Sequence, residues 1–386
     1  MQIHLSPTPI QTHSYLRAAP LFNRYNQQCT QFGASSDMAV SLQSAVPAPA
    51  SDINSQLSAL LTSAAVAPLD DAGWIRVTGS DRVRWLNGMV SNFVQQLAPG
   101  EGCYNFVLNA QGRILGDLTA FAQPDAFLLE TSHEQLPALL AHLDRFIIMD
   151  DVELTDLSDQ RTGVLIAGPD ALRTVQELGG TPCSTPPSPT QLTAAIDLKQ
   201  TAYRGAAVDL IRAYSPLVSR FEIWGDSATI AQITSELASI PKATPEALER
   251  LRILEGTPRY GTDIRNSETA KDLPQETAQT RALHFSKGCY LGQEIVERIR
   301  SRGNVHRTFH GFELTGALPI PGTELTAESY PRPVGELTSV AKIELPQRGT
   351  VQLALGYIRR EALDRGLKLE YPGGIATPIA MPYPIS

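Results

Sequence analysis

The assignment of this chain starts from residues 287–294, which read Lys287-Gly288-Cys289-Tyr290-Leu291-Gly292-Gln293-Glu294. The stretch places a thiol beside a lysine, two glycines, an amide and a carboxylate, a combination that no hydrophobic core requires. Directly after it, Ile295, Val296 and Ile299 have the spacing of one helical face. We therefore predict a short helix over residues 293–299.

Cys289 has two interpretations from the residues alone. If the helix begins near Tyr290, Cys289 lies at its N-terminus, where free N–H groups, the positive end of the helix dipole and Lys287 favour a reactive thiolate. Alternatively, Cys289 is a small buried hydrophobic residue, the commoner state of a free cysteine. The local pattern leaves both open.

The run Lys-Gly-Cys-Tyr-x-Gly-Gln-Glu resembles the signature of the YgfZ family, folate-binding relatives of the glycine-cleavage T-protein (aminomethyltransferase) that support iron-sulfur enzymes. Three more segments resemble parts of the same fold and occur in the same order: residues 74–86, 109–118 and 252–264. These matches cover the chain from about Trp74 to Arg307.

The resemblance implies an α+β fold, with a T-protein-like folate-binding domain followed by a small C-terminal β-barrel. The pattern after Gly303 agrees, because short apolar runs alternate there with Pro and Gly turns. We expect a polar N-terminal arm over 1–50, the folate-binding domain over 51–302 and the barrel domain over 303–386.

Local periodicity predicts the individual elements. Helices are expected over 52–61, 81–90, 134–145 and 245–255, and strands over 74–78, 163–167, 207–213, 219–224, 308–314, 336–343 and 351–358. Residues 104–108 and 114–121 are expected to pair across the turn Asn109-Ala110-Gln111-Gly112, since Asn and Gly suit tight turns. The proline-rich run 181–189 is expected to be a loop.

Composition excludes several classes of protein. Of 386 residues, 42% are apolar and 19% charged, which is ordinary for a globular protein. A net charge of -8 argues against a general nucleic-acid-coating role. We find no secretion signal and no apolar stretch near the roughly 20 residues of a membrane span.

The four cysteines are far apart and form no Cys-x-x-Cys pair, so neither a disulfide framework nor a cysteine-rich metal site is expected. His306 and His310 would share a strand face, but no third ligand is near. We expect a cytoplasmic, monomeric protein without a permanently bound metal.

Two acids stand out through the resemblance. Glu222 lies where the T-protein family has the glutamate that binds the pterin edge, whereas without the resemblance it would be read as an exposed strand acid. Asp117 resembles one of the paired acids of the T-protein hairpin, but Gly116 replaces the other, so a turn-capping role is equally open. Cys289 stands where the T-protein has an aspartate, which argues against ammonia-releasing transfer from a lipoyl arm.

The resemblance thus implies a cofactor, tetrahydrofolate or a one-carbon derivative of it, and a set of site residues. The residues implied as catalytic are Cys289, Lys287 and Asp117. The folate contacts are Glu222, Asp117, Tyr104, Arg252, Tyr260, Gln293 and Arg298.

A group of arginines, Arg298, Arg300, Arg302 and Arg307, forms a basic run in this acidic chain. The first three would share a face only in an extended segment. They are candidates for binding a polyglutamate tail, an RNA phosphate or an acidic partner, and alternatively form a solvated charge run.

Two functions follow. We favour a folate-binding factor, non-enzymatic or weakly catalytic, that maintains iron-sulfur proteins through Cys289, with client or assembly proteins as partners. The alternative is a tetrahydrofolate-dependent one-carbon transferase that acts on a small molecule or tRNA through Asp117 and Glu222.

Overall fold

The computed structural model describes residues 52–180, 196–267, 272–303, 305–328 and 330–385. The arm predicted over 1–50 and the loop predicted over 181–189 lie outside these residues, as do Cys29 and Cys183. All statements below concern the described residues.

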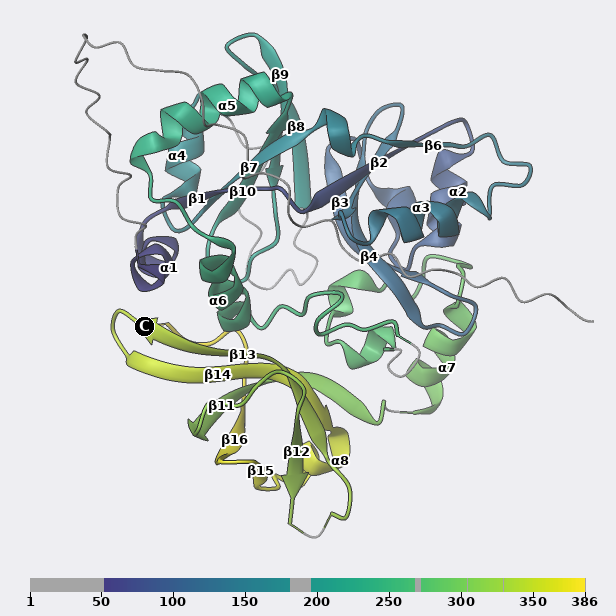
Figure 1. The fold of residues 1–386 in the computed structure, drawn as a ribbon. Helices are drawn as coiled ribbons and strands as arrows, with labels where there is room; N and C mark the ends of the chain where they lie inside the picture. The colour runs from purple at the N-terminus through teal and green to yellow at the C-terminus, as the bar shows by residue number, and fades with distance from the viewer. Residues whose placement is uncertain (1–51, 181–195, 268–271, 304, 329, 386) are drawn as a thin grey trace, which may run out of the picture. The chain divides into compact units, whose positions relative to one another are not determined.

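An antiparallel sheet of ten strands, in the order β1-β7-β10-β9-β8-β3-β4-β5-β2-β6, carries the first part of the chain (Figure 1). Its strands are β1 (Ala65–Pro68), β2 (Ala72–Thr78), β3 (Glu101–Leu108), β4 (Ile114–Ala122), β5 (Phe127–Ser132), β6 (Glu153–Asp156), β7 (Thr162–Ala167), β8 (Ile196–Tyr203), β9 (Ala206–Arg212) and β10 (Arg220–Gly225). The predicted hairpin is confirmed, because β3 and β4 pair with Tyr104 opposite Thr119.

The sheet is strongly curled. Trp74 in β2 and Trp224 in β10 have five strands between them in the sheet order, yet their ring centroids are only 5.1 Å apart in an edge-on contact. Phe121, Leu128 and Ile211 belong to the same buried cluster. The curl therefore gives the sheet an inner face on which strands from its two halves meet.

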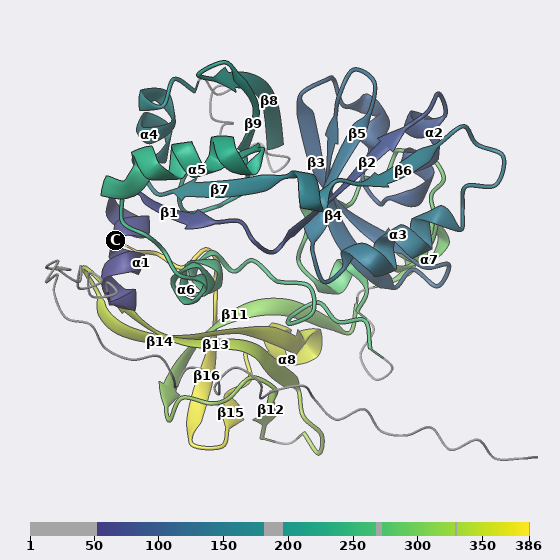
Figure 2. The same ribbon diagram turned by 45° about the horizontal axis from the view of Figure 1, so that its top comes forward.

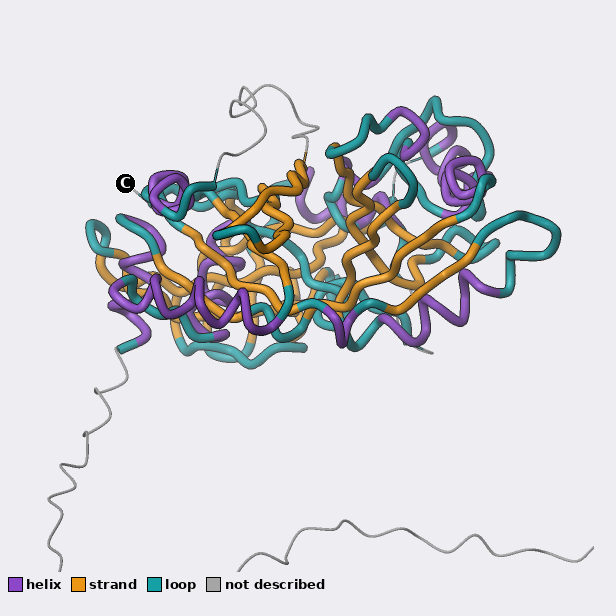
Figure 3. The backbone as a smooth tube through the Cα atoms, turned by 90° about the horizontal axis from the view of Figure 1, so that it is seen from above, coloured by secondary structure: helices purple, strands orange, loops and turns teal. Residues whose placement is uncertain are grey.

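Helices cover the outer face of each half of the sheet (Figures 2 and 3). The helices are α1 (Ile53–Thr62), α2 (Arg82–Met89), α3 (Leu136–Asp144), α4 (Ala171–Glu177), α5 (Ser227–Glu236), α6 (Pro245–Glu255), α7 (Gln293–Arg302) and α8 (Arg360–Asp364). Residues of α2 and α3 pack in one core cluster with β2, β4 and β5. Residues of α4 and α5 pack in another with β7 and β10.

The predicted helices over 52–61, 81–90, 134–145 and 245–255 are confirmed as α1, α2, α3 and α6. The last of them shows how the sequence sets its ends. Thr244 caps the N-terminus by accepting a hydrogen bond from the Ala247 N–H, and Pro245 occupies the first turn. Gly256 ends the helix with a φ of 70°, a left-handed conformation that glycine adopts without strain.

The predicted C-terminal barrel is confirmed as a closed barrel in the order β11-β14-β13-β12-β15-β16. Its strands are β11 (Arg307–Gly316), β12 (Thr323–Ala327), β13 (Gly335–Leu345), β14 (Gly349–Arg359), β15 (Leu369–Tyr371) and β16 (Gly374–Ile379). Phe312, Leu337 and Leu369 are fully buried in its own core cluster.

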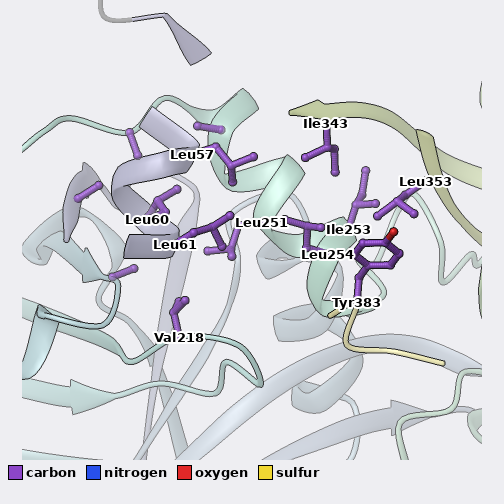
Figure 4. Close-up of a cluster of buried hydrophobic side chains, with 14 of the residues drawn as sticks. Leu57, Leu60, Leu61, Val218, Leu251, Ile253, Leu254, Ile343, Leu353 and Tyr383 are labelled. Atoms are coloured by element: carbon purple, nitrogen blue, oxygen red, sulfur yellow. The ribbon is translucent and has the colours of Figure 1, made fainter. Parts of the chain in front are cut away.

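The barrel also shares a hydrophobic core with α1 and α6. Leu57 and Leu254 pack in one cluster with Ile343 and Leu353 of the barrel (Figure 4). Residues 50–386 accordingly group as one compact unit. We retain the domain boundary near residue 302 as a proposal, since the two predicted domains share this core.

Among the described residues, no helix combines the length and apolarity needed to cross a membrane.

Candidate functional site

Lys287 anchors the cysteine motif to the end of α2. Its side chain is buried, and Nζ donates hydrogen bonds to the carbonyl oxygens of Asn87, at 2.6 Å, and Val90, at 2.5 Å. The last carbonyls of a helix lack intrahelical partners and carry the negative end of its dipole, so they suit an ammonium group. Burial lowers the pKa of Lys287 to about 7, opposed by the nearby Cys103.

Gly292 fits the motif against the β3–β4 turn. It has a φ of 83°, and a Cβ there would lie 2.5 Å from the Asn109 carbonyl oxygen and 3.1 Å from the Gly112 Cα. The Leu291 N–H donates to the Gly88 carbonyl oxygen at 3.0 Å. Three stretches that the sequence singled out, α2, the 109–112 turn and the cysteine motif, are thus in direct contact.

Cys289 is exposed, so its interpretation as a small buried hydrophobic residue is wrong. The idea that it lies at a helix N-terminus is also wrong, because α7 starts at Gln293. The reason is the left-handed Gly292, which the contact with the turn requires and which precedes the first helical residue. The Gln293 side chain accepts a hydrogen bond from the Tyr290 N–H at 3.3 Å.

On the inner face of the sheet, Asp117 lies in a hydrogen-bonded group. The Tyr104 hydroxyl donates to its Oδ2 at 2.5 Å, and Gln135 Nε2 donates to its Oδ1 at 2.9 Å. Burial raises the pKa of Asp117, against the effect of these hydrogen bonds. Turn capping is excluded for Asp117, because it lies within β4 opposite Phe106 and the Asn109 side chain caps the turn.

Arg281 lies beside this group. It belongs to the short 3₁₀ helix η5 (Thr280–Ala282), and its guanidinium carbon is 4.1 Å from the ring centroid of Tyr104 and 3.9 Å from that of Tyr214. Its Nε donates to Gln279 Oε1 at 3.0 Å. Burial lowers its pKa, while Tyr104, Tyr214 and Asp117 act in the opposite direction. Arg281 therefore places a cation between two aromatic faces.

Glu222 is a buried carboxylate, with an exposed fraction of 3%, so its interpretation as an exposed strand acid is wrong. Its Oε1 accepts hydrogen bonds from Arg220 Nε at 3.1 Å and Nη2 at 2.9 Å, and its Oε2 accepts from Trp224 Nε1 at 3.2 Å. Glu130 of β5 interacts electrostatically with it. Burial, followed by the Glu222 carboxylate, raises the pKa of Glu130 well above its usual range.

Of the other predicted folate contacts, Tyr260 contacts β4, the strand that carries Asp117. Its hydroxyl donates to the Leu115 carbonyl oxygen at 2.5 Å, and its pKa is raised by burial and, to a smaller extent, by Asp117. The guanidinium of Arg252 donates hydrogen bonds to the side chains of Glu249, Asp263 and Ser339. Arg298 is exposed on α7, whose first residue is Gln293.

The arginine group does not form one surface. Arg298, Arg300 and Arg302 would share a face only in an extended segment, and this condition is not met, because α7 continues to residue 302. Arg300 stacks on Phe285 at 4.2 Å, measured to the ring centroid. Arg307 pairs with the carboxylates of Asp272 and Glu276 instead.

No cluster of three or more His, Cys, Asp or Glu side chains that could hold a metal occurs in the described parts of the chain. Cys103 and Cys289 are both free thiols.

Sequence reasoning missed Glu130, Gln135, Tyr214 and Arg281. Glu130 carried one usable signal, a carboxylate in the apolar strand sequence Phe127-Leu128-Leu129-Glu130. The other three gave none, because tertiary structure brings them together: Gln135 follows the strand paired with β4, and Arg281 comes from η5, far along the chain.

The fold is that of the T-protein. The structure is similar to that of glycine cleavage system aminomethyltransferase T from Bartonella henselae, with a TM-score of 0.71, 19% identity and coverage of 86% of this chain and 89% of that one. The GCVT N-terminal domain family matches residues 23–278. The chain belongs to this family, which confirms the resemblance found in the motifs.

Several relatives are similar at modest identity. The putative chloroplastic transferase At1g60990 of Arabidopsis thaliana is 25% identical over 78% of this chain and 66% of its own length. The mitochondrial iron-sulfur cluster assembly factor IBA57 homolog of Pyricularia oryzae is 30% identical over 60% of this chain and 53% of its own length. The tRNA-modifying protein YgfZ of Vibrio vulnificus is 25% identical over 76% and 82%, respectively. The chain thus spans only about half to two thirds of the first two relatives.

Proposed function

We propose that this protein is a folate-binding factor that supports the assembly or repair of iron-sulfur proteins, with Cys289 as its functional thiol. One observation carries the proposal: an exposed cysteine sits on a loop whose two sides are anchored by buried Lys287 and by Gly292. An exposed thiol adds little to the core, whereas a fixed and accessible one suits reaction with a second molecule. The relatives named as an iron-sulfur cluster assembly factor and as the tRNA-modifying protein YgfZ support this proposal.

A reduced folate fits the inner face of the sheet. It presents a flat pterin ring with a donor-rich edge and an anionic glutamate tail, so its site needs aromatic faces, carboxyl groups and a cation. Tyr104 and Tyr214 supply aromatic faces, and Arg281 between them supplies the cation. Asp117 and Glu222 supply carboxyl groups. The buried Nε1 of Trp74 has no hydrogen-bond partner among the described residues, which leaves a donor for a ligand.

When bound, the folate would supply a carrier for one-carbon units. The chain's own residues would bind and orient it: Asp117 is held in place by Tyr104 and Gln135, and Arg281 by Gln279. We retain Tyr260, Arg252, Gln293 and Arg298 as further proposed contacts. Of these four, Tyr260 has the strongest support, since its hydroxyl donates to the carbonyl oxygen of Leu115, two residues before Asp117.

An iron-sulfur cluster would be cargo and not a resident group. A cluster usually takes four cysteine ligands, and the four cysteines of this chain are widely spaced. Cys289 would act in cluster transfer or in thiol repair on a client or assembly protein, assisted by Lys287, which holds the loop. Free thiols at Cys103 and Cys289 fit a reducing compartment, and we propose a cytoplasmic monomer.

Two measurements test this function together. Cells that lack the protein should lose activity of a cluster-dependent enzyme and regain it when the native chain is expressed. Purified native protein should bind 5-formyltetrahydrofolate in calorimetry. If the activity is unaffected by the loss of the protein, the iron-sulfur role is wrong, and if no reduced folate binds, the folate role is wrong.

The hydrogen-bonded Asp117 favours one second candidate, a folate-dependent one-carbon transferase acting on a small molecule or tRNA. Its carboxyl is buried, oriented at both oxygens and raised in pKa, as expected of a group that handles a proton. This candidate predicts turnover of labelled methylenetetrahydrofolate by the native protein and its loss in Asp117→Asn. Absence of turnover with every acceptor, alongside folate binding, would contradict it.

A further inference from the structure

A pocket of about 710 Å³ lies where β11 begins and β14 ends, and charged side chains make up most of its lining. This volume is within the range of pockets that hold small organic ligands. Three acids line it, one from the 3₁₀ helix η4 (Pro274–Glu276) and two from α8: Glu276, Glu361 and Asp364. Four arginines line it as well: Arg307, Arg359, Arg360 and Arg365.

Two of these arginines are directly opposite each other, Arg307 on β11 and Arg359 on β14. Side chains in such positions share one face of the sheet and lie close together, and two like charges there are destabilising. Arg307 is compensated, because Asp272 and Glu276 pair with its guanidinium. Arg359 is exposed, and no carboxylate in the described parts of the chain pairs with it. One cation at the wall of the pocket is therefore left for an anion from outside.

The short helix α8 and the residue after it add charges of both signs. Arg365 Nη2 lies 2.9 Å from a Glu361 oxygen, and Arg360 Nε lies 3.7 Å from an Asp364 oxygen. All four side chains are exposed. Exposed ion pairs contribute little to stability, so a ligand can replace them at low cost. A lining of this kind suits a ligand that carries an anionic group and hydrogen-bond donors together.

We propose that this pocket binds a free ribonucleotide. Arg359 and Arg360 donate hydrogen bonds to its phosphate, because guanidinium groups match phosphate oxygens in pairs. Glu361 and Asp364 accept hydrogen bonds from its ribose hydroxyls, a role that carboxylates have in dinucleotide sites. Binding changes no covalent bond. The inference goes beyond the proposed function, because none of these four residues is a proposed folate contact or lies in the cysteine motif.

The observations favour a free nucleotide over two other polyanions. An RNA chain is bound along an extended basic surface, whereas this chain has a net charge of -8 and these arginines line one pocket. A polyglutamate tail offers carboxylates but no hydroxyl donors for the acids of the lining. A nucleotide supplies both, since its phosphate has three strong acceptor oxygens and its ribose has two hydroxyls.

The test measures binding of the common ribonucleoside 5′-monophosphates to the native full chain by calorimetry. Low salt is used, because exposed charges are screened at higher ionic strength. The variants are Arg359→Gln and Asp364→Asn, and the matched control is Arg173→Gln, an exposed arginine of α4 outside the pocket. The further probes are the 2′-deoxynucleotides, a short single strand of RNA and triglutamate.

We expect at least one ribonucleotide to bind the native chain, and Arg359→Gln to bind it about tenfold more weakly or worse, as for loss of a charged hydrogen-bond donor. The 2′-deoxy form should bind the native chain about fivefold more weakly, the effect of one lost hydrogen bond, and Asp364→Asn should reduce this preference. Arg173→Gln should match the native protein. The comparison of the two nucleotides uses native protein alone, so it remains a readout if a variant fails to fold.

The inference is overturned if no ribonucleotide binds, if Arg359→Gln binds as tightly as the native chain, or if the 2′-deoxy form binds equally well. Binding of RNA or triglutamate without binding of a mononucleotide also overturns it. Binding of 5-formyltetrahydrofolate, measured on the same proteins, should be unchanged in Arg359→Gln. The folate proposal and the nucleotide site can therefore fail independently, and the two results distinguish them.

Discussion

Lys287 and Cys289 are two residues apart and have opposite environments. The Lys287 ammonium is buried and donates to the Asn87 carbonyl oxygen at 2.6 Å, whereas Cys289 is exposed. Gly288 between them has a φ of 92°, which allows the chain to reverse the direction of successive side chains at low cost. The buried lysine therefore fixes the loop on which the thiol is presented.

The contact between Gly292 and the β3–β4 turn predicts unequal effects of two similar substitutions. Gly292→Ala introduces a left-handed alanine whose Cβ would overlap the Asn109 carbonyl oxygen, at 2.5 Å. We expect roughly 2–4 kcal/mol of destabilisation from strain and overlap. Gly288→Ala has a similar φ but open space around its Cβ, so about 1 kcal/mol from strain alone is expected. Urea unfolding measures both, and equal losses would show that the predicted contact does not matter.

The buried Lys287 predicts a pH-dependent stability. Its pKa is about 7 in the folded protein and near the ordinary 10.5 when unfolded. Above pH 7 the unfolded state binds more protons than the folded state, so stability rises with pH. Lys287→Met removes this contribution. The melting temperature of the native protein should rise relative to that of Lys287→Met between about pH 7 and about pH 8.5, below the range in which Cys103 titrates.

A constant difference between the two melting temperatures over that range would contradict the assignment of Lys287 as a buried, partly neutral amine. The comparison between the two proteins cancels the contributions of other titrating groups, because the substitution leaves them in place.

The buried pair of Arg252 and Asp263 joins α6 to the barrel. Their atoms are 2.6 Å apart, Asp263 is fully buried, and Arg252 also donates to Ser339 of β13 at 2.7 Å. Arg252→Met leaves a buried carboxylate without its cation, so we expect a loss of about 3–5 kcal/mol in stability. The control Arg173→Met breaks an exposed pair with Asp170 and should cost less than about 1 kcal/mol.

Thermal unfolding of the two variants compares these values. If Arg252→Met is as stable as Arg173→Met but no longer binds a reduced folate, Arg252 is a ligand contact and not a structural clamp.

Much of the fold could be predicted from the sequence, since it depends on local signals. Pro245 and Gly256 mark the ends of α6, and the Asn109–Gly112 turn predicts the hairpin of β3 and β4. The apolar spacing after the cysteine motif likewise predicted α7, although it did not predict the exposed loop at Cys289. Each of these features depends on a short, continuous stretch of sequence.

The inner face could not be predicted in the same way. Glu130 and Glu222 are neighbours only because the curled sheet brings β5 to β10, and Arg281 reaches Tyr104 from a 3₁₀ helix far along the chain. Glu222 was recognised through the family, but its burial and its bonds with Arg220 and Trp224 depend on tertiary structure. Sequence periodicity predicts which face of a single helix or strand is buried, but it does not predict contacts between elements that are far apart in the sequence.

The most direct test of the central claim is the rescue of a cluster-dependent enzyme by Cys289→Ser in cells that lack the protein. The control is Cys103→Ser, which changes the other described thiol, a partly buried one. We expect Cys289→Ser to accumulate and melt like the native protein, because the side chain is exposed, yet to restore no enzyme activity. Cys103→Ser should restore activity in proportion to its folded amount. Full rescue by Cys289→Ser would contradict the account.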